Sequence, residues 1–197
     1  MTLIDQKHFG WQHAQALPPH GYTCAYCDQK VSSARGYKLG AAADGGGPQR
    51  AALHICPHCG NPTFFGFADQ QVPAVAFGSS VPHVPDDLGA LFSEDRNSTS
   101  AGAFTGAVLL ARKMLMHIAV EQGAATGQSF LHYVEFLSDK GFVPPNGKHW
   151  VDHIRKKGNE ATHEIQVMAD SDAKELLVFL EMLLRFIYEF PKLVPPP

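Results

Sequence analysis

The chain lacks the features that would assign it to a secretory route or to simple phosphate binding. Its 16 Lys and Arg residues are outnumbered by 19 Asp and Glu residues, for a net charge of −3. A protein that holds nucleic acid mainly by neutralising phosphates usually carries a basic excess, so this balance argues against that class. The first five residues contain neither a basic start nor an apolar signal core, which predicts a cytoplasmic protein.

No long hydrophobic run is free of charge. The two most apolar stretches, residues 101–120 and 176–190, are interrupted by charged side chains: Arg112, Lys113, Glu181, Arg185 and Glu189. Neither stretch therefore predicts a membrane-spanning helix, and we expect no membrane partner. A composition of 45% hydrophobic and 18% charged residues is that of an ordinary soluble globular protein.

No cysteine remains outside two CxxC pairs, Cys24–Cys27 and Cys56–Cys59. Two such pairs supply the four thiolates of a tetrahedral site, so we predict one Zn²⁺ bound by all four. The intervening residues 28–55 are more than a usual ribbon contains, and the Gly-rich stretch 41–48 predicts a flexible hairpin tip. A catalytic zinc keeps one position open, so the closed set predicts a structural ion.

Three other interpretations of these cysteines are weaker. Disulfides would suit a secreted domain, and no signal segment is visible. A thioredoxin-like redox motif would need a CxxC that opens a helix in a βαβ unit, and the pattern shows none. His54 and His58 flank the second pair and could replace a thiolate, although the four cysteines already complete the set.

The pattern of apolar residues and breakers predicts an α+β protein, in which a small β zinc ribbon precedes an all-α antiparallel bundle. Short strands are expected at residues 36–39, 50–55 and 61–67. Helices are expected at 105–121, 129–140, from about 150 onward, and at 172–190, with a short one after Pro85 and Pro191 as the final stop. The expected segments are an extended N-terminal arm (1–20), the zinc ribbon (21–70), a Pro-rich connector (71–104), the helical bundle (105–191) and a disordered tail (192–197).

The most suggestive polar cluster lies on the helix expected after residue 150. Arg155, Asn159 and His163 recur at i, i+4 and i+8 and would share one broad stripe. A guanidinium, a carboxamide and an imidazole together can bind a phosphate and move a proton. The same spacing also suits a local side-chain network that ties the helix to its neighbour, and spacing alone favours this structural role.

Three motifs carry a resemblance to a known family. Residues 154–163 (IRKKGNEATH) resemble the "IRxxGNxxAH" signature of the domain-of-unknown-function family forty-one forty-five. Residues 112–115 look like its "RxxLE" helix, and residues 188–191 look like its terminal "lYexP". The segment around the second CxxC pair is similar to the zinc ribbon that often precedes this domain in bacterial proteins.

The resemblance implies a HEPN-like helical bundle, a class that includes metal-independent ribonucleases of defence systems that work as dimers. In active members an Arg and a His separated by four to six residues act on RNA. His163 and Asn159 match the end of that motif, whereas the positions at the required separation are Lys156, Lys157 and Gly158, with Arg155 one step farther. A lysine holds phosphate as a point charge and not as a bidentate fork.

Three functions follow as hypotheses. The leading one is a non-catalytic interaction module, a homodimer associated with nucleic acid or a protein complex in bacterial defence. The second is an endoribonuclease, with His163 as base, Asn159 orienting the groups, and Arg155, Lys156 or Lys157 binding phosphate. The third is binding of a nucleotide at the same stripe without cleavage.

Overall fold

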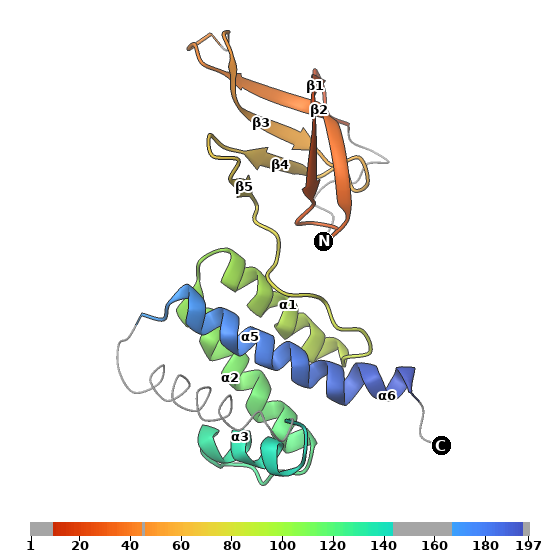
Figure 1. The fold of residues 1–197 in the computed structure, drawn as a ribbon, viewed down its shortest axis with the longest axis vertical. Helices are drawn as coiled ribbons and strands as arrows, with labels where there is room; N and C mark the ends of the chain where they lie inside the picture. Colours follow the sequence, from red (N-terminus) through yellow and green to blue (C-terminus); the bar gives the residue numbers. More distant parts are fainter. Residues whose placement is uncertain (1–9, 45, 144–166, 195–197) are drawn as a thin grey trace. The chain divides into compact units, whose positions relative to one another are not determined.

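The computed structural model describes residues 10–44, 46–143 and 167–194. The chain divides into two compact units, residues 1–75 and 76–197 (Figure 1). The first unit holds an antiparallel sheet and the second holds helices, which confirms the predicted α+β class. The helix expected from about residue 150, with the polar stripe Arg155, Asn159 and His163, lies outside the described residues.

The sheet is a five-stranded antiparallel meander in the order β1-β2-β3-β4-β5. The long strand β2 pairs with β1 through its first half and with β3 through its second half. The strands are β1 (Gln15–Thr23), β2 (Lys30–Gly40), β3 (Gln49–Ile55), β4 (Pro62–Phe65) and β5 (Gln71–Val72).

Strand β1 begins inside the segment that we expected to be an extended arm. It contains Pro18 and Pro19, and its register with β2 shifts between Ala16 and His20. Proline has no amide to donate, so it is tolerated on an edge strand or at an irregularity. Because the two prolines suppress the strand pattern in the sequence, only the pairing with β2 reveals β1.

The helical unit contains α1 (Asp86–Ser100), α2 (Phe104–Glu121), α3 (Phe130–Asp139) and α5 (Asp170–Leu184). Helix α2 packs against α1, α3 and α5 (Figure 1). The predicted helices 105–121 and 129–140 are confirmed to within one residue at each end, and the predicted stops Gly123 and Gly141 have φ of 103° and 81°. Helix α1 is longer than predicted, because its buried stripe continues from Leu88 and Phe92 through polar residues.

The C-terminal helix does not stop at Pro191. Helix α5 passes into the π-helical turn η2 (Arg185–Glu189), and α6 (Phe190–Leu193) continues it. Pro191 lies in α6, directly after the π-helical turn. Lys192 and Leu193 are therefore helical, although we expected the chain to be disordered from residue 192.

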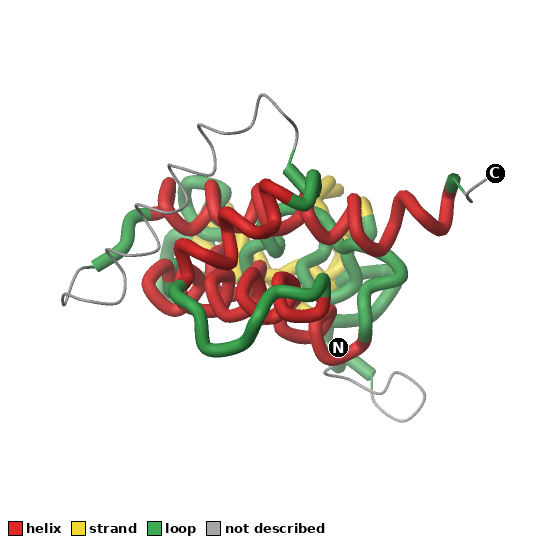
Figure 2. Tube along the Cα trace, turned by 90° about the horizontal axis from the view of Figure 1, so that it is seen from below, coloured by secondary structure: helices red, strands yellow, loops and turns green. Residues whose placement is uncertain are grey.

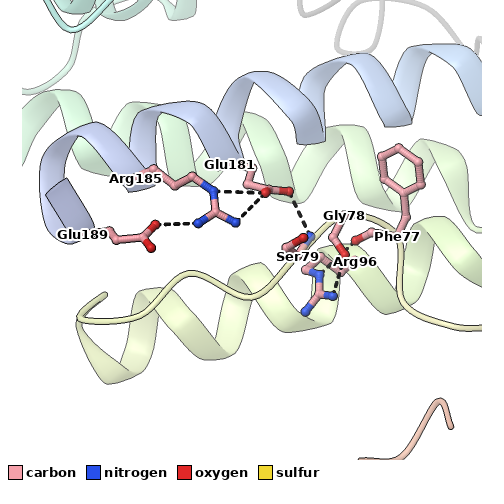
Figure 3. A network of polar contacts seen from close by, with 7 residues as sticks. All are labelled: Phe77, Gly78, Ser79, Arg96, Glu181, Arg185 and Glu189. Atoms are coloured by element: carbon pink, nitrogen blue, oxygen red, sulfur yellow. Dashed lines mark hydrogen bonds and ion pairs between the residues drawn. The ribbon is translucent and has the colours of Figure 1, made fainter. Parts of the chain in front are cut away.

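The connector that precedes α1 is bound to the helical unit through residues 77–79, which we call the strap (Figure 3). Arg96 on α1 donates to the carbonyls of Phe77 and Gly78, at 2.9 and 2.8 Å. The Ser79 amide donates to the Glu181 carboxylate on α5 at 2.9 Å. The strap therefore links α1 to α5 through hydrogen bonds, although the two helices are far apart in the sequence.

The core of the helical unit is apolar. Its fully buried large side chains come from α2, α3 and α5: Val108, Met114, Leu115, Ile118, Val134, Leu137, Leu176, Leu177, Leu180, Leu183 and Leu184. Within the described part of the chain, no helix has the length and apolar character needed to cross a membrane.

Candidate metal centre

Two turns of the sheet bring the four cysteines together. Cys24 and Cys27 lie in the turn between β1 and β2, and Cys56 and Cys59 lie in the turn between β3 and β4. The four sulfur atoms all lie within 4.8 Å of one another. The two CxxC pairs, which are distant in the sequence, thus form a single site.

The two turns share one backbone pattern. Four hydrogen bonds close them: Asp28 N to Cys24 O (2.8 Å), Cys24 N to Gln29 O (2.9 Å), Gly60 N to Cys56 O (2.8 Å) and Cys56 N to Asn61 O (3.0 Å). The residue after each pair has a positive φ, 57° at Asp28 and 68° at Gly60. Glycine and aspartate are among the residues that adopt this region most readily, which explains both choices.

The two short distances between sulfurs of different CxxC pairs fit a tetrahedral metal site. Cys24 Sγ lies 3.6 Å from Cys59 Sγ, and Cys27 Sγ lies 3.9 Å from Cys56 Sγ. A Zn–S bond of about 2.3 Å with tetrahedral angles places two sulfurs about 3.8 Å apart. A disulfide needs about 2.05 Å, and all four residues are free cysteines. The geometry therefore supports a metal site over the disulfide interpretation.

Burial and nearby N–H groups both affect the charge of the sulfurs. Burial raises the pKa of Cys24 to about 12, so without a nearby positive charge this thiol stays protonated. Two N–H groups point at sulfur: Cys59 N lies 3.5 Å from Cys56 Sγ, and Asn61 Nδ2 lies 3.5 Å from Cys59 Sγ. Such donors stabilise metal-bound thiolates and orient them.

The neighbouring histidines are not part of the cysteine cluster. His54 is buried, and its Nδ1 lies 3.1 Å from the Ser33 carbonyl oxygen. Burial, and then the charge of His20, lowers the pKa of His54. The rings of His20 and His54 lie 5.2 Å apart, and both lie against Phe65. His54 therefore serves the packing of the sheet, while His58 is exposed.

The predicted phosphate and catalytic residues Arg155, Lys156, Lys157, Asn159 and His163 all lie outside the described residues. They remain predictions from the sequence.

The two other motifs lie within the described residues. Arg112 on α2 places its guanidinium 4.3 Å from the centre of the Phe130 ring, and burial lowers its pKa. Tyr188 in η2 donates to Glu121 at the end of α2, at 2.5 Å, and burial raises the pKa of this phenol. The terminal motif therefore ties the C-terminal helix to α2.

The C-terminal helix carries exposed apolar side chains that we call the C-terminal patch. Most apolar residues of α5 are buried in the core of the unit, but some are not. The patch comprises Val178 (56% exposed), Phe186 (44%), Phe190 (41%), Leu193 (63%) and Val194 (75%). The rings of Phe186 and Phe190 stack edge to face at 5.3 Å. Figures 1 and 2 show this end of the helix extending past the other helices of its unit.

Two buried polar residues of α1 were not predicted from the sequence. Asp95 and Thr99 on α1 are 1% and 3% exposed, in line with the buried Leu88 and Phe92. The only signal in the sequence is the spacing, since 88, 92, 95 and 99 recur as one face of a helix. An apolar pattern search cannot find this face because half of it is polar.

The fold and the cysteine cluster define a class of protein: a sheet with a four-thiol metal site, followed by a separate helical unit. The model of the family "Domain of unknown function (DUF4145)" matches residues 93–194, and the chain belongs to this family. This confirms the resemblance drawn from the three motifs. Neither the curated proteins nor the solved structures contained a match.

Proposed function

We propose that the protein is a non-catalytic interaction module, in which a structural Zn²⁺ stabilises the sheet and the helical unit assembles with a second copy. The four-cysteine cluster carries this proposal. Four thiolates complete a tetrahedral shell and leave no position for a substrate or a water. A small sheet with a short apolar core needs such an ion to remain folded.

Thiolate ligands select soft or borderline metals, and four sulfurs in a tetrahedron suit zinc or iron. Metal analysis of the full chain purified without added metal tests the choice. We expect one zinc per chain, lost in Cys56→Ser and retained in His58→Ala, which is the control for a side chain beside the site. Iron at this stoichiometry, or no metal with four titratable thiols, would reject the structural zinc.

The C-terminal patch supports assembly with a second copy of the chain. Large exposed aromatic side chains on one helix are typical of an interface. The charges beside the patch are balanced, because the two acidic residues Glu181 and Glu189 are offset by Arg185, which bonds both of them, and by Lys192. Two copies of a chain with net charge −3 repel each other overall, so a locally neutral surface is the favourable place for them to meet.

Light scattering coupled to size exclusion tests this assembly at micromolar concentration. We expect a dimer for the wild type and a monomer for Phe186→Glu. Leu109→Glu is a matched control, because Leu109 on α2 is also 44% exposed and belongs to the same unit. Equal loss of the dimer in both variants, or a monomeric wild type, contradicts assembly through the C-terminal patch.

Association with nucleic acid and a role in bacterial defence are implied by the family resemblance and belong to the same proposal. The ribonuclease alternative depends on residues 155–163 and gains no support from the described residues. It requires metal-independent cleavage of single-stranded RNA that disappears in His163→Ala. The nucleotide alternative requires a thermal shift with a nucleotide that disappears in Arg155→Ala.

A further inference from the structure

Asp95 is a carboxylate in the interior of the helical unit. It is 1% exposed, and neither of its oxygens has a hydrogen-bond partner among the described residues. The Thr99 hydroxyl, one turn later on α1, is also buried and without a partner there. Buried polar groups are nearly always paired, so two adjacent exceptions indicate a specific role.

An ionised Asp95 would be costly in this position. Leu88 and Phe92 precede it on the same face of α1, and both belong to the apolar core. Helix α1 packs this face against α2 and α5. Burying an ionised carboxylate without a partner is far more expensive than burying the neutral acid, so the group tends to take up a proton instead.

The charges carried by α1 do not compensate for this cost. Glu94 adds repulsion to an ionised Asp95. Arg96 follows directly, but its Nε and Nη2 donate to the strap carbonyls of Phe77 and Gly78 (Figure 3). The only cation next to Asp95 in the sequence is therefore directed at the strap.

None of the charged groups on α2 and α5, the two helices that pack on α1, forms a hydrogen bond with Asp95. On α2, Arg112 lies over the Phe130 ring, and its buried Nη1 bonds neither Asp95 nor any other group among the described residues. His117 pairs with Glu121, and Lys113 is exposed. On α5, charged side chains bond near their own helix or the strap: Asp170 with Lys174, Asp172 with the Ala169 amide, and Glu181 with Arg185 and Ser79; Glu175 is exposed.

We propose that Asp95 is a proton-binding site inside the helical unit, which makes the packing of α1 depend on pH in the neutral range. A protonated carboxyl is neutral, so it can be buried among apolar side chains at a much lower cost than the carboxylate. The proton thus removes the charge that burial disfavours. When it leaves, the charge stays in an apolar environment.

The direction of the pH dependence follows from this burial. Burial raises the pKa of Asp95 from 3.8 to about 7, with Glu94 contributing further. Between these values the folded state holds a proton that the unfolded state has lost, so stability falls as pH rises. Above about 7 both states are ionised and the dependence levels off. The opening equilibrium of α1 is thus expected to increase by up to about tenfold per pH unit below 7.

Hydrogen exchange of the intact chain, corrected for intrinsic rates, measures this opening on amides of residues 86–100. We expect protection to fall from pH 5.5 to 7 in the wild type and to be nearly independent of pH in Asp95→Asn. Asp87→Asn is the matched control: it makes the same substitution on the same helix, but at an exposed residue, and it should keep the wild-type slope.

A wild-type slope that persists in Asp95→Asn would overturn the proposal, as would a wild type with no slope. If Asp95→Asn does not fold, carbon NMR of the aspartate carboxyl groups in the wild type decides. A buried Asp95 signal that titrates near pH 7 supports the site, and one that titrates near pH 4 overturns it.

Discussion

Substitution of Gly78 by alanine tests the strap that joins α1 to α5. Gly78 has φ of +70°, and a Cβ there would lie 2.7 Å from Glu181 Oε2 and 3.1 Å from Leu177 Cδ2. The first distance is too short for a real contact. Glu181 would have to move, and its hydrogen bond from the Ser79 amide would break.

The magnitude has two parts. Alanine in the left-handed region costs about 1 kcal/mol relative to glycine. Losing a hydrogen bond to a charged group costs about 1.5–2 kcal/mol. We therefore expect Gly78→Ala to lower the free energy of unfolding of the helical unit by about 2.5–3 kcal/mol.

Gly102→Ala separates the two parts. Gly102 also has a positive φ, +79°, but nothing lies within 4 Å of its Cβ position. Only the backbone cost of about 1 kcal/mol is expected there. In a Glu181→Ala background, Gly78→Ala should also cost only about this amount, since the side chain that it displaces is absent.

Urea unfolding followed by helical circular dichroism, with zinc present throughout, measures these differences. Equal destabilisation by Gly78→Ala and Gly102→Ala would refute the reasoning, because it would mean that the strap contributes nothing beyond backbone conformation. An undiminished effect of Gly78→Ala in the Glu181→Ala background would refute it as well.

The other predictions concern the metal centre. Removing the metal with a chelator should unfold the sheet and leave the helices intact, since zinc binding in structural sites is worth on the order of 10 kcal/mol; hydrogen exchange should show protection lost in residues 15–65 only. Gly60→Ala should lower the affinity for zinc, measured by competition with a chelator, because Gly60 has φ of 68°. Asp28→Gly, at the equivalent position of the first turn, should leave the affinity unchanged or raise it slightly, and a loss equal to that of Gly60→Ala would contradict the shared backbone pattern.

The cysteine site could be predicted because its ligands come in local pairs. Each CxxC turn sets the separation of two sulfurs through its own backbone, so spacing alone indicates the chemistry. Helices α2 and α3 were equally predictable, because regular apolar spacing and the glycines after each helix are local signals.

Other features could not be predicted because they depend on neighbours. A proline normally ends a helix, but here the helix runs from the π-helical turn η2 through Pro191 to Leu193. Pro18 and Pro19 conceal β1, which exists because β2 offers an edge to pair with. For β1, the pairing with β2 overrides the intrinsic preference of the two prolines.

The amino-acid sequence by itself determined the four-thiol site, the α+β order of the two units and the family, because these reside in local spacing and residue type. Only the tertiary structure decided that the polar Asp95 on α1 is enclosed while the apolar Val178 on α5 and Phe186 in η2 face solvent. Whether a side chain is buried depends on which other element covers its face of the helix. The spacing of apolar residues along one helix does not specify that element.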